Sequence, residues 1–424
     1  MITTDDSSHD VPVWARPQAF PKAPAGWGWL DYKGSSHACD SIEALVETMR
    51  TDRTSQLNLV WTPDHEWMVL PEEVPALGEA LRSARGEWVK DDLAESHDRV
   101  RWFGIILGGM LALAFFNGFA KTGGGSDGFP RVQSGLQSIF SSGNVGVAVL
   151  MFLIFAFIPW YQARKQQNSL AKWTSAGVAA SIPALKMDTW LERQKAPVTK
   201  VLLGFILCVT AAQLASQVQA SGWASLLAIF HTWGGIPQAG LVKAAYLQGE
   251  WWRLFTAPLM HGNAVHLFMN ASALLYLGKR LEVFARWPHL VLVFFLSACI
   301  GGEASARFVT APSVGASGGL MGWLGFLLVF ETLHKELVPL SSRKRLAAGV
   351  LITALIGLVG YRFIDNAAHL GGLLAGMFYA LIVFPKSSSG KRPRSTLSDR
   401  LAGSAALVVI GMAALLAVYK IASH

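Results

Sequence analysis

The chain has 424 residues, of which 52% are hydrophobic and 15% are charged, and its net charge is +8. This composition excludes an intrinsically disordered chain and fits neither a collagen-like chain nor a small disulfide scaffold. The charge is uneven, because residues 1–101 carry 10 Lys/Arg and 18 Asp/Glu whereas residues 102–424 carry 26 and 10. We therefore expect an acidic, water-soluble part followed by a membrane protein, and no nucleic-acid partner.

Residues 1–101 are expected to form a small soluble α+β domain. Its first 38 residues are rich in Pro, Gly and Ser and are expected to be mostly irregular. No catalytic motif occurs in this part, so docking or regulation is its expected role. The remaining pattern predicts a helix over 40–50, two strands of a hairpin over 57–61 and 66–70, and a helix over 71–89.

The rest of the chain is expected to be an all-α, multi-pass membrane protein. It contains nine apolar runs, at about 102–119, 145–161, 201–220, 264–278, 290–308, 316–333, 346–361, 366–384 and 402–419. Several are shorter than the roughly 20 residues of a lipid-spanning helix, which inner helices of a bundle tolerate. The expected domains are two extra spans over 102–161, a basic cytoplasmic linker over 162–200, a core over 201–384, and a basic loop with a C-terminal transmembrane helix over 385–424.

The connecting segments predict the orientation of these spans. Four alternate loops, 162–200, 279–289, 334–345 and 385–401, hold 19 Lys and Arg residues, against 7 on the other side. Because basic loops stay on the cytoplasmic side, we expect a multi-pass protein of the plasma (inner) membrane. Its N-terminus is then cytoplasmic and its C-terminus outside.

One outer segment, residues 221–263, differs from an ordinary loop. It contains GWASLLAIFHTWGGI (222–236), which is too short to span the membrane and too apolar for a free loop. This stretch is expected to lie in the membrane interface or to re-enter the bilayer.

The first cluster of polar residues in an apolar run is His266 and Asn270. These residues are four apart, so they project from the same face of a helix and offer a donor pair for a developing oxyanion. Alternatively, they are structural and hydrogen-bond neighbouring helices. A metal site is less well supported, because His261 and His266 are five apart without a carboxylate or Cys at ligand spacing. No metal or cofactor is expected.

The second cluster is SVGASGGLMGWLGF (313–326), at the start of a span. Ser317 lies between Gly315 and Gly318, so the backbone can turn sharply and approach a substrate closely. The N–H of Ser317 at a helix N-terminus is unpaired and is another possible oxyanion donor. The alternative is that these small residues serve helix packing alone.

The third cluster is DNAAHLGGLLAGM (365–377), where His369 precedes Gly372 and Gly376. His369 is either a packing histidine or a base, since close packing of two Gly-rich helices would place it beside Ser317. Asp365, one turn before His369, is interpreted as a solvated helix-end residue rather than one that orients the histidine. The convergence of three polar clusters near the outer ends of spans favours serine-hydrolase chemistry.

With these motifs in this order, the sequence resembles the rhomboid intramembrane serine proteases over about residues 201–384. The resemblance implies a six-helix core, with Ser317 as nucleophile and His369 as general base and acid. It implies an oxyanion site from His266, Asn270 and the Ser317 amide, and a transmembrane protein as substrate, cut near the outer bilayer face after a small residue. The supporting residues of the motifs are Trp252, Arg253, His261, Gly315 and Gly318.

Two features of the chain depart from the rhomboid pattern. Met321 stands where many bacterial members carry an aromatic that stacks on the histidine, and the chain before residue 201 lies outside the resemblance. Glu303 and Arg307, at i and i+4, are expected to form a structural ion pair.

The chief alternative function is a catalytically inert rhomboid-like factor that binds or escorts membrane proteins. A transporter is a weaker alternative, because the inverted repeats it predicts are not evident.

Overall fold

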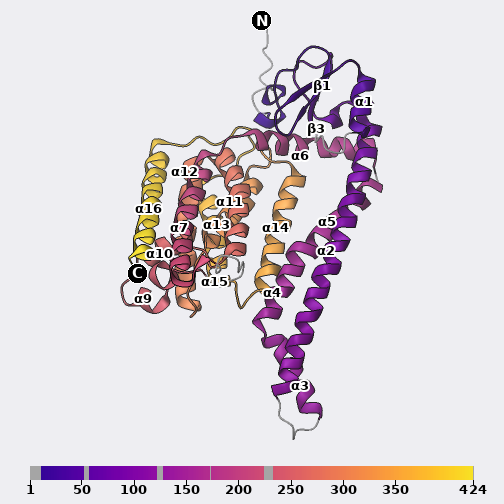
Figure 1. Ribbon diagram of the computed structural model, residues 1–424. Coiled ribbons are helices and arrows are strands. Elements are labelled where there is room, and N and C mark those ends of the chain that lie inside the picture. The colour runs from indigo at the N-terminus through magenta and orange to yellow at the C-terminus, as the bar shows by residue number, and fades with distance from the viewer. Residues whose placement is uncertain (1–10, 52–56, 122–127, 172, 224–232, 424) are drawn as a thin grey trace. The chain divides into compact units, whose positions relative to one another are not determined.

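A computed structural model describes residues 11–51, 57–121, 128–171, 173–223 and 233–423 (Figure 1). The chain is mostly helical, with one small sheet near its N-terminus, as the sequence predicts. It divides into two compact units. The N-terminal unit consists mainly of Pro17–Lys186 with Ile352–Ile364, and the C-terminal unit mainly of Met187–Leu351 with Asp365–His424.

The N-terminal unit begins with a three-stranded antiparallel sheet of order β2-β1-β3. Its strands are β1 (Trp27–Asp31), β2 (Ser36–Cys39) and β3 (Leu57–Trp61). The predicted short helix is confirmed as α1 (Ile42–Thr51), which packs its buried Leu45 and Met49 into a core shared with Trp29 and Val60. A compact apolar core of this kind supports the expected α+β domain.

Two details of this domain differ from the prediction. Residues 27–38 are not irregular, because β1 is held between two partner strands and Gly28 lies flat against the Trp61 ring, where a Cβ would come within 2.2 Å of it. Pairing and packing thus override the low strand propensity of Gly and Asp. The predicted hairpin over 57–61 and 66–70 is confirmed in part. The chain turns at Thr62–His65, and Val60 and Val69 pair in antiparallel fashion through two hydrogen bonds, but residues 66–70 form no regular strand and β3 pairs along its length with β1.

Helix α2 (Gly78–Lys121) leads from this domain into the first apolar run without a break. Two 3-10 turns, Pro71–Glu73 and Pro75–Leu77, precede it, so the predicted second helix begins later than expected. The first half of α2 closes the core of the sheet domain through Ala80, Leu81 and Ala84. The expected domain boundary at residue 101 therefore falls inside one continuous helix.

The second half of α2 forms a helical hairpin with the chain that follows. This chain consists of α3 (Gly128–Ser141), α4 (Gly143–Phe152), a π-helical turn (Leu153–Phe157) and α5 (Ile158–Ala171). Phe103 stacks on Phe155, and Ser134 Oγ donates a hydrogen bond to the Gly118 carbonyl at 2.9 Å. Only 11% of the apolar windows of α2 and of Val145–Leu170 is buried, which is expected where lipid replaces protein neighbours.

The segment predicted as a linker, residues 162–200, is mostly helical. It contains the end of α5 and helix α6 (Ser175–Arg193). Lys186 of α6 forms an ion pair with Glu73 at 2.6 Å within the N-terminal unit. The Lys and Arg residues of segment 162–200 therefore lie mostly on helices rather than on an irregular chain.

The C-terminal unit is a helical bundle (Figure 1). Its long helices are α7 (Pro197–Ser221), α11 (Ala264–Ala285), α12 (Trp287–Phe308), α13 (Ser317–Leu333), α14 (Leu340–Val359), α15 (Asn366–Val383) and α16 (Leu397–Ala422). Three short helices, α8 (Ile236–Ala239), α9 (Lys243–Leu247) and α10 (Arg253–Thr256), lie between α7 and α11. Of the predicted interfacial stretch 222–236, residues 224–232 lie outside the described residues.

Helix α13 is the centre of this bundle, with fully buried Trp323, Phe326 and Phe330. Glycines bring α15 into backbone contact with it. A Cβ at Gly372 would lie 2.0 Å from the Gly318 carbonyl oxygen, and one at Gly376 would lie 1.8 Å from that of Gly322. Only glycine permits this approach, as in other small-residue interfaces between membrane helices.

Six described helices are long and apolar enough to cross a membrane. They contain the predicted runs of α2, α4–α5, α7, α12, α15 and α16. The other three predicted runs also form helices, but α13 has 17 residues and α11 and α14 are less apolar. Several apolar helices of spanning length make the chain a multi-pass membrane protein, and the shorter α13 is shielded by its neighbours.

Ion pairs fasten both ends of the bundle. The predicted pair of Glu303 and Arg307 is confirmed at 2.7 Å. At the opposite ends of α11 and α13, Arg280 and Glu331 form a buried two-point pair, with Arg280 Nη2 to Glu331 Oε2 at 2.9 Å. A pair buried this deeply fixes the register of the two helices, because either charge alone would be left unsatisfied.

Candidate active site

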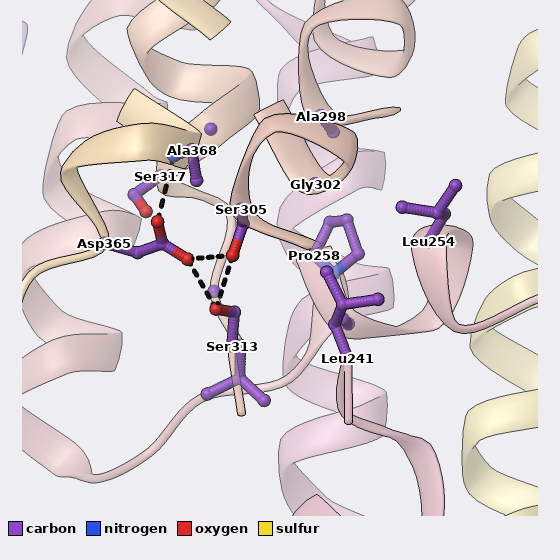
Figure 2. A pocket seen from close by; sticks show the side chains of 14 residues that line it. Leu241, Leu254, Pro258, Ala298, Gly302, Ser305, Ser313, Ser317, Asp365 and Ala368 are labelled. Atoms are coloured by element: carbon purple, nitrogen blue, oxygen red, sulfur yellow. Dashed lines mark hydrogen bonds between the residues drawn. The ribbon is translucent and has the colours of Figure 1, made fainter. Parts of the chain in front are cut away.

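Ser317 is the first residue of α13 and lies at the edge of a cavity (Figure 2). The polar lining comes from Ser317, Ser305, Ser313 and Asp365, and the apolar lining includes Leu241, Leu254 and Pro258. Because the first N–H groups of a helix have no partner within it, the amide of Ser317 is available near its own hydroxyl. A hydroxyl and a backbone donor thus stand together at the start of α13.

The loop before Ser317 requires glycine at position 315. Gly315 has a φ of +118°, a conformation that L side chains rarely adopt. A Cβ there would lie 2.7 Å from the ring of His266 and 3.3 Å from Asn270 Nδ2. The missing side chain therefore lets the backbone two residues before Ser317 touch both predicted oxyanion donors.

His266 and Asn270 are positioned by the first turns of α11. Asn263 caps this helix, with its Oδ1 accepting from the His266 N–H at 2.9 Å. Asn270 Nδ2 lies 3.0 Å from His261 Nε2, and the rings of His261 and His266 meet edge-on with 5.1 Å between centroids. The three side chains form one connected group, in which His266 and Asn270 face Gly315.

His261 supports this group from a fully buried position. Its backbone is held by Gln213 of α7, which accepts from the His261 N–H at 3.0 Å and donates to the His261 carbonyl at 2.9 Å. Gln213 was missed in the sequence, although a glutamine inside the apolar run 201–220 is the kind of exception that identified the other polar residues. It acts as a clamp that fixes the chain entering α11.

His369 lies in the first turn of α15, one turn before Gly372. The backbone contact of Gly372 with Gly318 therefore brings the turn that carries His369 against the start of α13. The His369 ring is close enough to His266 for the two to interact electrostatically. Both Ser317 and His369 are described, and no hydrogen bond joins their side chains, a common state of catalytic pairs without substrate.

Trp252 and Arg253 lie apart from the cavity lining and hold the outer segment together. Arg253 Nη1 donates to the carbonyls of Pro237 at 3.0 Å and Gly240 at 2.7 Å, and Nε pairs with Glu250. The guanidinium also stacks over the Trp252 ring at 4.7 Å. A buried arginine that satisfies two backbone carbonyls is a structural brace for this segment.

A polar cluster that the sequence did not predict lies beside Ser317 (Figure 2). Asp365 caps α15, with its Oδ1 accepting from the Ala368 N–H at 2.9 Å, and its Oδ2 accepts from the hydroxyls of Ser305 and Ser313. Lys243 Nζ donates to Ser313 Oγ at 2.5 Å. The interpretation of Asp365 as a solvated residue is thus wrong: it ends a helix, but it is half-buried and fully engaged.

Lys243, at the start of α9, supplies the positive charge of this cluster. Its side chain is buried, and burial lowers the pKa of Lys243 to about 8 while the Asp365 charge opposes that change. Little in the sequence distinguishes Lys243, Ser305 or Ser313, because each is an ordinary polar residue at a loop or helix end. Only the folded chain brings them to one carboxylate.

Comparison with known proteins shows which proteins this chain is similar to. A profile of the rhomboid domain matches residues 248–386. The chain is similar to rhomboid protease GluP of Bacillus subtilis, with 36% identity over 155 residues, which are 34% of this chain and 29% of GluP. It is also similar to the rhomboid protein YdcA of Bacillus subtilis, with 30% identity over 142 residues, which are 32% of this chain and 70% of YdcA.

A third relative bears on activity. Inactive rhomboid protein 1 of Bos taurus is 29% identical over 145 residues, which are 34% of this chain and 17% of that protein. The matched region thus spans less than a third of GluP and of this bovine relative. The profile match over residues 248–386 includes every site residue predicted from the sequence, since all of them lie between Trp252 and His369.

Proposed function

Because this chain belongs to the rhomboid family, we propose that it is an intramembrane serine endopeptidase that cleaves transmembrane segments. The observation that carries the proposal is the pair of contacts around the start of α13. Gly318 packs on Gly372, beside His369, and Gly315 packs on His266 and Asn270. Nucleophile, base and oxyanion donors are thereby gathered around one loop.

In the proposed mechanism His369 takes the proton of the Ser317 hydroxyl as its oxygen attacks the scissile carbonyl. The negative charge that develops on the carbonyl oxygen is stabilised by His266 Nε2–H, Asn270 Nδ2–H and the Ser317 amide. The imidazolium of His369 then protonates the departing amide nitrogen. Water attacks the acyl-enzyme with His369 again as base, which releases the second product and restores Ser317.

The placement of the site supports cleavage near the outer bilayer face. Ser317, His369 and His266 all lie in the first turns of α13, α15 and α11. In Figure 1 these helix starts lie at the same end of the C-terminal unit as α9 and α10. The basic segments 279–289, 334–345 and 385–401 follow or precede the opposite ends, which the positive-inside bias assigns to the cytoplasm.

The proposed substrate is a transmembrane segment of another membrane protein, with a small residue before the cut. The cavity beside Ser317 is bordered by Leu241, Leu254 and Pro258, which suit an apolar chain. Its polar side suits a peptide whose helix has unwound, since the backbone groups exposed by unwinding need hydrogen-bond partners.

We expect Ser317→Ala to abolish cleavage of a reporter transmembrane substrate, with a rate at least about 10³-fold below that of the wild type. His369→Ala is expected to have a similar effect, because a serine hydroxyl without a base is a weak nucleophile. Ser404→Ala, at an exposed position of α16, is the matched control and should cleave at the wild-type rate. Persistent cleavage by Ser317→Ala would show that the nucleophile is wrongly assigned.

The similarity to an inactive rhomboid protein keeps a second candidate function, a factor that binds membrane proteins without cutting them. Reaction with a serine-directed fluorophosphonate separates the two functions. Labelling of the wild type but not of Ser317→Ala supports the protease. A folded wild type that binds a transmembrane segment yet remains unlabelled and uncleaving would support the binding factor.

A further inference from the structure

We propose that Asp365 is the positioning residue of the Ser317–His369 pair, acting through one carboxylate that joins the helix of the base to the loop of the nucleophile. The proposal rests on the protease function proposed above. It assigns to this chain an acidic third participant that acts through the other two residues rather than on the substrate.

The first attachment is to the helix of the base. Asp365 Oδ1 accepts from the Ala368 N–H at 2.9 Å, and the Asp365 carbonyl accepts from the His369 N–H at 3.0 Å. Side chain and main chain of one residue thus fix two successive amides of the first turn. A cap of this kind contributes about 1 kcal/mol to a helix and sets where its first turn begins.

The second attachment is to the loop of the nucleophile. Asp365 Oδ2 accepts from the hydroxyls of Ser313 and Ser305, which are themselves 2.9 Å apart. Ser313 precedes Ser317 by four residues, and its backbone forms a two-bond bridge with Leu241, at 2.9 and 3.1 Å. The two oxygens of the carboxylate therefore hold two different elements, and these are the elements that carry His369 and Ser317.

The charge of Asp365 adds to this geometry. Asp365 and His266 are the titratable groups that interact electrostatically with His369 from the elements around it. A carboxylate near the ring favours the imidazolium that forms when His369 accepts the serine proton. Lys243 stands behind Ser313, to whose hydroxyl it donates, and its positive charge interacts with the carboxylate of Asp365.

Asp365→Asn separates positioning from capping, because asparagine caps helices as well as aspartate does but carries no charge. We expect the purified full-length variant in detergent to unfold at nearly the wild-type temperature. Its kcat should fall about 10- to 100-fold with KM within about twofold of the wild type. The acidic limb of its kcat–pH profile should move to lower pH, since the imidazolium loses a stabilising charge.

Two further variants sharpen the comparison. Ser313→Ala keeps the cap and the charge of Asp365 and removes its tie to the loop, together with the acceptor of Lys243. We therefore expect a smaller loss of kcat, about 3- to 10-fold, with the acidic limb unmoved. Glu303→Gln is the matched control, since Glu303 is a half-buried carboxylate of α12 that pairs with Arg307 and accepts from the Tyr246 hydroxyl. It should retain the wild-type kcat and pH profile.

The outcomes of these experiments distinguish the positioning role of Asp365 from the protease function on which it rests. Asp365→Asn with wild-type kcat and an unmoved acidic limb overturns the positioning role while Ser317-dependent cleavage stands. If Asp365→Asn does not fold, Ser313→Ala decides, and an unchanged kcat there overturns the proposal. A wild type without Ser317-dependent cleavage or labelling overturns the protease function and the positioning role together.

Discussion

The tautomer of His266 follows from its neighbours. The Gly262 N–H points to His266 Nδ1 at a long 3.5 Å, which makes Nδ1 the acceptor. A neutral ring with Nδ1 as acceptor carries its proton on Nε2. Nε2 is also the atom that lies 2.7 Å from the Cβ position of Gly315. The Nε2–H of His266 therefore faces the loop before Ser317, as the proposed oxyanion role requires.

Lys243 predicts a dependence of stability on pH. Its pKa is about 8 in the folded chain and 10.5 in its ordinary state, so the folded chain binds fewer protons between these values. The free energy of unfolding should therefore rise with pH from about 8 to 10.5, by an amount on the order of 1–3 kcal/mol. Lys243→Met removes this contribution.

Thermal unfolding of the wild type and of Lys243→Met in detergent, at pH 7.5 and 9.5, measures this contribution of Lys243 to stability. The difference in Tm between the wild type and Lys243→Met should change in favour of the wild type as pH is raised. Lys335→Met, at an exposed position after α13, is the control and should show a difference that does not depend on pH. If the Tm difference between the wild type and Lys243→Met were also independent of pH, it would contradict the prediction.

The residues of the candidate site differ in how readily the sequence identifies them. Ser317, His369 and Asn270 are conspicuous because polar groups in apolar helices need partners or a purpose. Lys243 and Ser313 belong to segments between the helices, where polar residues are ordinary. Their importance depends on a long-range contact with Asp365, which no local pattern encodes.

At the scale of elements, the contact between α13 and α15 sets the geometry of the site. The Gly372-xxx-Gly376 spacing predicts close packing with another helix, and the structure adds which carbonyls each glycine meets. Hydrophobic association between helices is weak in lipid, so close backbone packing carries much of the interaction. A shift along this seam would move His369 relative to Ser317.

We expect Gly376→Ala to destabilise the bundle by about 1–3 kcal/mol, the range for overpacking a tight interior. Its Cβ would meet the Gly322 carbonyl oxygen at 1.8 Å, and backbone cannot move aside as a flexible side chain can. Proteolytic cleavage should fall as well, because α15 must retreat. Unfolding in a denaturing detergent and the cleavage assay measure the two effects.

Gly204→Ala in α7 is the control, because nothing lies within 4 Å of its Cβ position. Alanine favours a helix over glycine, so this variant should be as stable as the wild type or slightly more stable. If Gly376→Ala matched Gly204→Ala in stability and activity, the tight contact would have no energetic role.

At the scale of the whole molecule, composition and charge predict the membrane helices better than they predict the small sheet. All nine apolar runs form helices, since a membrane chain must satisfy its backbone hydrogen bonds within each segment. The sheet was mispredicted because its order β2-β1-β3 depends on tertiary pairing. The continuity of α2 was missed because the change from polar to apolar composition resembles a domain boundary.

The proposed orientation predicts which loops face the cell exterior. In a background without native cysteines, Thr310→Cys, before α13, should react in intact cells with a maleimide that cannot cross membranes. Ser341→Cys, at the start of α14, should react only after the cells are permeabilised, because its basic segment 334–345 is expected inside. Both positions are exposed. The reverse pattern would contradict the orientation.

The uninterrupted course of α2 has a mechanical consequence. The same 44-residue helix packs on the sheet at one end and against Ser134 of α3 at the other. At 1.5 Å per residue it is a lever about 66 Å long. A tilt of about 5° at the sheet displaces its far end by about 6 Å, more than a full helical turn. A tilt of the sheet would therefore move the far end of α2 together with the helix α3 that packs on it.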